Sequence, residues 1–409
     1  MISQKFKQTE IGKIPEDWEE TTIGNLGGLK NGVNFNRDDF GEGFPVINVT
    51  NLFRGRYATI GDLREIKEKT LNNPESYFVK RGDILFARSS LKHSGTGQAA
   101  MVFNLPKEET VFSGFIIRFR KYPNSELDDN FLNYLVRSEF YRKFIRKFID
   151  GTTITNINQG FLSNMPINLP SLPEQKSIAS TLSSLDAKIE LNNKMNKILE
   201  AIGQAIFKKW FVDERKEEWE ISTIGKELKT ILGGTPSRVK PEYWNGDINW
   251  INSGKVNEFR ITEPSEKITT EGLNKSATSL LPAGSVVLAI TGATLGQISR
   301  LEINSCANQS VIGILENEKF SSPYIDYWVK DKINDIIGFQ TGGAQQHINK
   351  RNVDNYSLLV PDEKTLDRFN KLVQPIFKQI SINCFQNQTL SQIRDTLLPK
   401  LMNGEVRVK

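Results

Sequence analysis

The chain has 409 residues, enough for two or three domains, and its hydrophobic (38%) and charged (25%) fractions are typical of a soluble globular protein. No stretch approaches the roughly 18 consecutive apolar residues of a membrane span, and residues 1–17 contain no apolar signal core, so neither membrane insertion nor secretion is expected. The net charge of +5 permits binding to nucleic-acid phosphates without requiring it, and the two cysteines, Cys306 and Cys384, form no metal-binding or disulfide pattern, which fits a reducing cytoplasm.

A first globular domain is expected over residues 1–171. Residues 1–17 form an arm, and the domain proper opens at Trp18 with the letters WEETTIGNLG. A turn at Gly82 leads into the β-rich run ILFA at residues 84–87, which predicts a strand. The letters LNYLV at residues 132–136 are expected to lie on a helix.

A first long helix is predicted over residues 172–212. Its apolar residues recur mostly in alternating steps of 4 and 3, which is the heptad pattern of a helix that packs on another helix. A polar linker, DERKEE, follows at residues 213–218.

A second domain is expected over residues 219–361, because landmarks of the first domain return there in the same order. The letters WEISTIGKEL open it at Trp219, VVLA at residues 286–289 answers ILFA, and IDYWV at residues 325–329 answers LNYLV. The repetition indicates a tandem duplication, with insertions and deletions confined mainly to loops.

A second long helix is predicted over residues 362–403, followed by a tail at residues 404–409. Its pattern matches that of the first helix without a gap, so that Leu172 corresponds to Glu363. The matched pattern runs from Ile178 through Ile202 to Trp210 in the first helix and from Phe369 through Ile393 to Leu401 in the second. The expected seam residues are Leu182, Leu185, Ile189, Asn192, Asn196 and Leu199 on the first helix and Val373, Ile376, Ile380, Asn383, Asn387 and Leu390 on the second.

These elements predict an α+β fold in which two globular domains alternate with two long helices. Because the helices share one pattern, we expect them to form an intramolecular, antiparallel coiled coil with a pseudo-two-fold relation between the repeats. The seam asparagines lower stability but specify the register. This arrangement also predicts that the two chain termini lie close together. The alternative is two unrelated amphipathic helices, each packed on its own domain.

The sequence contains no recognisable catalytic motif. It has neither a GxxxxGK[ST] phosphate loop nor a GxGxxG turn, and only two histidines, His93 and His347. No metal ligands are predicted. A binding protein with two similar but non-identical domains is therefore expected.

Polar and basic residues cluster in the predicted loops of both domains and are candidates for DNA contacts. Arg, Asn and Gln make bidentate contacts to base edges, and Lys and Arg hold phosphates. For any one of them taken alone, the simpler interpretation as a solvated loop residue is favoured. In the first domain the candidates are Lys30, Asn34, Arg37, Arg54, Arg56, Arg88, Ser89, Ser90, Lys92 and His93, and in the second they are Ser237, Arg238, Lys240, Trp244, Asn245, Gln345, Gln346, His347, Lys350 and Arg351.

Several of these features together resemble the specificity subunits of Type I restriction–modification enzymes, over nearly the whole chain. They are the WE-x-x-x-IG openings at Trp18 and Trp219, the segment INLPSLPEQK from Ile167 to Lys176, and the paired long helices. The second helix is preceded by LLVPDE, a weaker version of the segment that lacks Pro-Glu-Gln.

The resemblance implies a non-catalytic, DNA-binding subunit of a prokaryotic complex. Each domain would be a target-recognition domain that recognises one half of a split site in double-stranded DNA, and the coiled coil would set the gap between the halves. Two modification subunits, which bind S-adenosylmethionine and methylate adenine, would dock on the helices, and restriction subunits that use ATP with magnesium could join. This chain would bind no cofactor itself. The outer-face lysines Lys194, Lys197, Lys208 and Lys209 are candidates to meet the modification subunits, or else form a solvated helix face.

Two other hypotheses remain open from the sequence. A two-headed coiled-coil scaffold for protein interactions would show no dependence on DNA sequence. An enzyme with an unfamiliar site would need a concave pocket with perturbed titratable groups.

Overall fold

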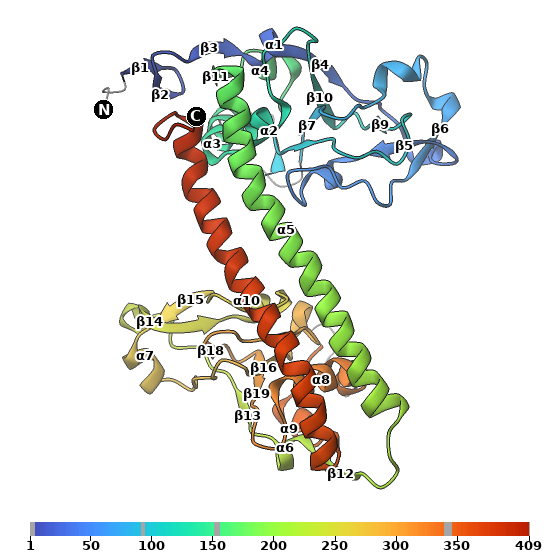
Figure 1. The fold of residues 1–409 in the computed structure, drawn as a ribbon, viewed down its shortest axis with the longest axis vertical. Coiled ribbons are helices and arrows are strands. Elements are labelled where there is room, and N and C mark those ends of the chain that lie inside the picture. The colour runs from blue at the N-terminus through green and yellow to red at the C-terminus, as the bar shows by residue number, and fades with distance from the viewer. Residues whose placement is uncertain (1–4, 91–94, 151–155, 339–345, 409) are drawn as a thin grey trace. The chain divides into compact units, whose positions relative to one another are not determined.

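A computed structural model describes residues 5–90, 95–150, 156–338 and 346–408. The chain divides into two compact units, one made of residues 1–187 and 391–409 and the other of residues 188–390. Each unit contains one globular domain, hereafter a head, together with part of each long helix (Figure 1).

The first head is built on a four-stranded antiparallel sheet with the order β4-β10-β7-β8. A smaller sheet has the order β6-β5-β9, and two strand pairs, β1-β2 and β11-β3, complete the set. The strands are β1 (Phe6–Thr9), β2 (Gly12–Pro15), β3 (Glu19–Thr22), β4 (Gly27–Asn31), β5 (Gly43–Ile47), β6 (Glu65–Lys67), β7 (Ile84–Ala87), β8 (Ala99–Met101), β9 (Val111–Phe112), β10 (Ile116–Lys121) and β11 (Pro166–Leu169). The helices are α1 (Ile23–Leu26), α2 (Asp129–Arg137), α3 (Glu139–Asp150) and α4 (Gln159–Ser163).

Apart from the β1-β2 pair, which has no counterpart among its described residues, the second head repeats this topology strand for strand. Its sheets have the orders β13-β19-β16-β17 and β15-β14-β18, and β12 pairs with β20. The strands are β12 (Glu220–Thr223), β13 (Thr230–Leu232), β14 (Trp244–Ile251), β15 (Glu266–Ile268), β16 (Val286–Ala289), β17 (Ile298–Arg300), β18 (Cys306–Ala307), β19 (Val311–Ile314) and β20 (Ser357–Val360). The helices are α6 (Ile224–Glu227), α7 (Thr270–Asn274), α8 (Ser322–Ile337) and α9 (Lys350–Asp354). The predicted duplication is confirmed, and α8 stands where the first head has the pair α2 and α3.

The central strands β7 and β16 are apolar throughout because both faces of each are covered. Ile84 and Phe86 belong to the core on one side of β7, whereas Leu85 and Ala87 belong to the core on the other. The same alternation divides β16 between two cores. A strand that is buried on both faces loses the apolar–polar alternation of a half-exposed strand, and this explains the continuous runs ILFA and VVLA.

The two long helices are α5 (Leu172–Lys208), which continues as a short π-helix (Lys209–Asp213), and α10 (Glu363–Met402). They pack antiparallel, as predicted, and are drawn in green and red in Figure 1. In the unit of residues 188–390, Asn383 donates a hydrogen bond to Asn196 and Asn192 donates one to Asn387, each over 2.8 Å. The seam asparagines therefore pair with one another across the helices.

All twelve expected seam residues are buried or half-buried. The prediction is wrong at two further positions of the pattern, Ile202 and Ile393, because these side chains are exposed. The neighbouring Gly203 instead faces the second head, where a Cβ atom would lie 2.1 Å from the hydroxyl of Tyr327. At this level of α5, the residue that contacts the head is therefore Gly203 and not Ile202.

The PEQ letters of the first helix have a structural explanation within their unit. Glu174 accepts a hydrogen bond from the indole of Trp18 over 3.2 Å. Gln175 is fully buried and is bonded at both ends of its amide, accepting from the backbone of Asp128 and donating to the backbone of Glu126 and Pro170. These bonds fix the start of the helix against the head.

The expected proximity of the two chain ends is confirmed. Arg407 pairs with Asp17 over 2.9 Å and also contacts Glu174 through two hydrogen bonds. Among the described residues, no helix combines the length and the apolar composition that crossing a membrane requires.

Candidate nucleic-acid interface

Three loops of the first head meet beside the ends of β4, β7 and β10. The backbone N–H of Arg88, which follows β7, donates to the carbonyl of Phe115 over 2.8 Å. The side chain of Asn34, from the loop after β4, lies against Gly114, because a Cβ atom there would be 2.0 Å from its oxygen. We call Asn34, Arg88 and residues 113–115 the first loop junction.

The predicted residues of the first head differ in how accessible they are. Asn34, Arg37 and Arg54 are exposed, whereas Lys30, Arg88, Ser89 and Ser90 are half-buried. Burial, with Arg118 nearby, lowers the pKa of the Lys30 ammonium, whose nitrogen lies 4.3 Å from the centre of the Tyr77 ring. The structure therefore brings Asn34 and Arg88 together and leaves Arg37 on a separate turn, the 3₁₀ helix Arg37–Asp39.

Arg56 does not lie on an open loop. Its side chain is 16% exposed and pairs with Asp186 of α5, with 3.8 Å between the charged atoms. Its guanidinium also lies over the rings of Tyr57 and Tyr134. Because these contacts hold Arg56 against the helix, it is removed from the set of proposed DNA contacts.

The second head has a loop junction at the equivalent place. Ile290, which follows β16, donates its backbone N–H to Ser310 over 2.9 Å, as Arg88 does to Phe115. Thr235, from the loop after β13, hydrogen-bonds the side chain of Gln309. His347 forms an isolated β-bridge with Thr291, which follows Ile290. We call Thr235, residues 290–291, residues 309–310 and residues 346–347 the second loop junction.

Several predicted residues of the second head are committed to contacts within the head. Trp244 is buried, and its indole donates to the carbonyl of Ser237 over 3.2 Å. The guanidinium of Arg238 lies 3.6 Å from the Trp244 ring centre and forms two hydrogen bonds with Glu266. Lys240 donates to Tyr243 over 3.0 Å. Trp244 is therefore a packing residue of a small core, and Arg238 forms a structural ion pair with Glu266 at the rim of that core.

The other predicted residues of this head lie at the surface. Asn245 is exposed and has a φ of 62°, a left-handed conformation that asparagine tolerates better than most residues. Ser237, Gln346, His347 and Arg351 are exposed, and half-buried Lys350 pairs with Asp354 over 2.6 Å. Lys92, His93 and Gln345 lie outside the described residues.

Phe115 was missed by the sequence reasoning. It is 64% exposed at the turn before β10, inside the first loop junction. A single phenylalanine in the letters FSGFII carries no signal that separates it from a core residue, so only the structure identifies it.

An enzyme with an unfamiliar site would need a concave pocket with perturbed titratable groups, and the structure has two cavities to consider. One, of about 210 Å³, includes Leu135, Tyr141, Asn168 and Met402, and the other, of about 270 Å³, includes the equivalent elements of the second unit. In the second, burial and the neighbouring Asp335 raise the pKa of Tyr356 to about 12. No group of three or more His, Cys, Asp or Glu within the described ranges could hold a metal ion.

Comparison with known proteins identifies the family. A family model described as the Type I restriction modification DNA specificity domain matches residues 15–201 and again residues 216–391. The specificity subunit of the Type I restriction enzyme MjaIX of Methanocaldococcus jannaschii is 26% identical, over 99% of this chain and 97% of that protein. The specificity subunit of the HindI enzyme of Haemophilus influenzae is 23% identical, over 95% of this chain and all of that protein.

A solved structure shares the fold. The crystal structure of a Type I restriction–modification specificity subunit from M. genitalium aligns with a TM-score of 0.59 and 17% identity, covering 98% of this chain and 99% of that one. The duplicated heads and the paired long helices are thus those of a known architecture. The chain belongs to the Type I restriction–modification DNA specificity subunits, which are non-catalytic members of their complexes.

Proposed function

We propose that each head of this specificity subunit recognises one half of a bipartite site in double-stranded DNA through its loop junction. The observation that carries the proposal is that one scaffold presents different side chains at equivalent places. The first junction offers Asn34, Arg88 and Phe115, where the second offers Thr235, Ile290 and Ser310. A shared scaffold with different side chains is what two independent half-sites require.

The chemistry of the first junction suits base recognition. An arginine can donate two hydrogen bonds to guanine, and an asparagine can exchange two with adenine. Phe115 offers an apolar surface to a thymine methyl group or to a displaced base. The basic residues around each junction would neutralise phosphates and position the head without selecting a sequence.

The long helices are proposed to set the gap between the half-sites and to dock two modification subunits. On α5, the side chains of Leu191, Met195, Ile198 and Ile202 are between 44% and 57% exposed, and their spacing of 4, 3 and 4 residues places them on one face. Together these residues form an apolar stripe that the described part of the chain leaves exposed. The stripe, flanked by the exposed Lys194 and Lys197, replaces the lysines alone as the proposed docking surface.

The partners are proposed to supply the chemistry. Modification subunits would bind S-adenosylmethionine, and restriction subunits, where present, would use ATP with magnesium. The assembled complex is proposed to act on DNA in the prokaryotic cytoplasm.

A binding selection tests the proposal. The full chain, purified with its modification partner, would be incubated with random duplex DNA at a stated salt concentration, since phosphate contacts alone bind DNA without specificity. We expect enrichment of two short motifs separated by a gap of constant length. Uniform recovery of all sequences by an intact complex would favour the protein-interaction scaffold instead.

An exchange of heads provides the matched control. Replacing residues 18–168 with those of a relative that recognises different DNA should change one half-site and leave the other half-site and the gap unchanged. A change in both halves would show that the heads do not act independently.

A further inference from the structure

The two heads carry an arginine at adjoining places in their fold, one residue apart. The backbone N–H of Ala58 donates to Met101 of β8, and that of Ile261 donates to Arg300 of β17, each over 3.0 Å. Met101 pairs with Ile84 and Arg300 pairs with the equivalent Val286, so Arg260 corresponds to Tyr57, the residue after Arg56. Arg56 and Arg260 both turn away from solvent toward the long helices.

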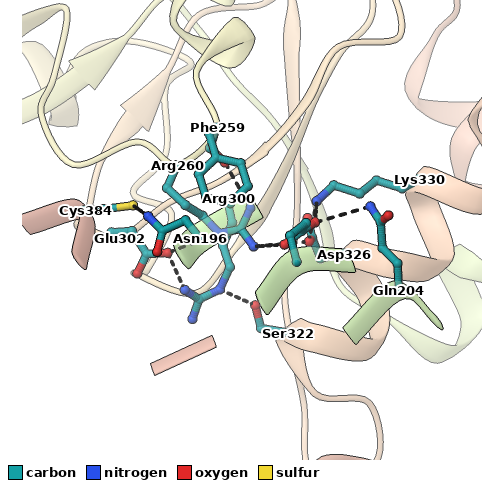
Figure 2. A network of polar contacts seen from close by, with 11 residues as sticks. Asn196, Gln204, Phe259, Arg260, Arg300, Glu302, Ser322, Asp326, Lys330 and Cys384 are labelled. Carbon is teal, nitrogen blue, oxygen red and sulfur yellow. Dashed lines mark hydrogen bonds and ion pairs between the residues drawn. The ribbon is translucent and has the colours of Figure 1, made fainter. Parts of the chain in front are cut away.

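In the second unit, Arg260 lies at the centre of a buried ionic network (Figure 2). Its side chain is 1% exposed, and it contacts Glu200 of α5 over 3.1 Å and Asp326 of α8 over 3.6 Å. Lys330 lies 2.7 Å from each of these two carboxylates. Arg260 thereby joins a loop of the head to the long helix α5 and to the head helix α8.

Two further residues complete the charge balance of this network. Glu302 lies 3.6 Å from Arg260 and 2.6 Å from Arg300. Three cations, Arg260, Arg300 and Lys330, thus face three carboxylates, Glu200, Glu302 and Asp326. A network without net charge can be buried at a lower desolvation cost than an unpaired ion.

In the first unit, Arg56 makes the corresponding contact with a different set of partners. Asp186 of α5 lies 3.8 Å from Arg56, accepts a hydrogen bond from Arg394 of α10 over 2.8 Å, and accepts another from Tyr134 of α2 over 2.5 Å. One carboxylate therefore ties the head loop, the head helix and both long helices together.

The helix positions beneath the two arginines are equivalent, although the arginines themselves are one residue apart in the fold. With Leu172 matched to Glu363, Asp186 corresponds to Phe377 and Gly203 corresponds to Arg394. Phe377 lies under the guanidinium of Arg260, 5.0 Å from ring centre to carbon, and Gly203 lies against Tyr327, the counterpart of Tyr134. Equivalent helix positions thus contact an arginine of the head in both units. We call these contacts the two arginine seats: an ion pair with Asp186 in the first unit, and an aromatic contact with Phe377 beside a buried network in the second.

We propose that Arg56 and Arg260 are positioning residues that fix the tilt of each head on the long helices. The apolar contact between the second head and the long helices includes Phe207 of α5 and ends on α10 at Phe377, the residue under Arg260. An apolar contact alone permits rocking, whereas directional ionic contacts at its end oppose it. If the heads recognise DNA as proposed above, these arginines hold the gap between half-sites to one length.

The first test needs no DNA. Spin labels at two exposed sites of one unit, Asn274→Cys on the head and Gln374→Cys on α10, would report their distance distribution in the full chain carrying Cys384→Ser. We expect a narrow distribution with Arg260, a clearly broader one for Arg260→Met, and partial recovery for Arg260→Lys. Lys319→Met is the control, since Lys319 is exposed and its contacts with Glu227 and Phe320 lie within the head. A distribution as narrow in Arg260→Met as in the control overturns the proposal.

The second test uses the binding selection on the complex with its modification partner. In Arg260→Met, both half-site motifs should persist while the preference for the wild-type gap over gaps one base pair longer or shorter falls by about ten-fold. Arg56→Met should behave in the same way, whereas a DNA-contacting Arg56 would instead lose its half-site motif. Broad spin-label distances with an unchanged gap preference would reduce both arginines to structural residues and overturn the positioning role.

The two tests separate this inference from the proposed function. If the wild-type complex selects no split motif, the proposed function fails, and the spin-label distances alone then decide whether Arg260 fixes the second head. A variant that unfolds would be recognised by the loss of helical circular dichroism, and Arg260→Lys then carries the comparison.

Discussion

The pairing of Asn196 with Asn383 supports a quantitative prediction about the coiled coil. Both side chains are at most 5% exposed, and the amide of Asn383 donates to the carbonyl oxygen of Asn196 over 2.8 Å. Substituting leucine for either one leaves the other with a buried polar group that has lost its partner. Substituting both places two apolar side chains opposite each other.

The magnitudes follow from the cost of an unsatisfied buried group. Each single substitution, Asn196→Leu or Asn383→Leu, should destabilise the local helix pair by about 1–3 kcal/mol. The double substitution should cost less than either single one, so that the coupling free energy in favour of the matched pair exceeds the cost of one single substitution, about 1–3 kcal/mol. Asn193→Leu is the control, because the bond that Asn193 accepts from Asn387 is exposed and its loss should cost under about 0.5 kcal/mol.

Native-state hydrogen exchange is the appropriate assay, because the chain has two units and a single unfolding transition is not expected. Exchange of the amides of residues 189–199 gives the free energy of local opening for each variant. Additive costs, with the double variant as unstable as the sum of the singles, would refute the pairing. Single substitutions that leave the free energy of local opening unchanged would show that Asn196 and Asn383 are not buried between the helices.

Further predictions follow from the same structure. Inserting one heptad after Ala187 and another after Leu390 should lengthen the gap between the half-sites by about 10 Å, or roughly three base pairs. The two positions face each other, because Asp186 bonds Arg394 and Asn192 bonds Asn387. A binding selection that returns an unchanged gap would contradict the spacer role. Phe115→Ala should weaken the first half-site by about 1–3 kcal/mol in competition binding and leave the second unaffected, whereas equal weakening of both would contradict a local contact. Ile198→Asp should abolish co-purification with the modification subunit while the free chain stays folded, with Lys226→Asp at an exposed position of the second head as the control; normal assembly would remove the apolar stripe from consideration. Burial raises the pKa of the Cys384 thiol to about 11, so alkylation by iodoacetamide should accelerate about ten-fold per pH unit between pH 7 and 10; fast reaction at pH 7 would indicate that the helices separate in solution.

The different chemistry of the two arginine seats bears on how such a subunit tolerates change. In the first unit one carboxylate, Asp186, serves Arg56, Arg394 and Tyr134 together. In the second unit Arg260 lies close to three carboxylates, those of Glu200, Glu302 and Asp326. The loss of Asp186 should therefore disturb its head more than the loss of any one acid disturbs the other head.

Much of the architecture was determined by the sequence alone, for a physical reason. A helix pair of this length must repeat its apolar residues in heptads, and a duplicated domain must keep its buried strands, so both leave periodic or repeated letters. The domain openings at Trp18 and Trp219 could be recognised in the same way. Their indoles are tied to acidic residues at the start of each long helix, Glu174 and Asp362, which explains why the openings and the helix starts recur together.

The functional surface was decided only by the tertiary structure. Arg56 and Arg238 have the composition of DNA contacts, but their guanidiniums are held by Asp186 and Glu266, residues far away in the sequence. Phe115 has the composition of a core residue, yet the turn before β10 exposes it. Residue type determines what a side chain can do. Whether it faces DNA, a helix or the core depends on long-range packing, which leaves no local pattern in the chain.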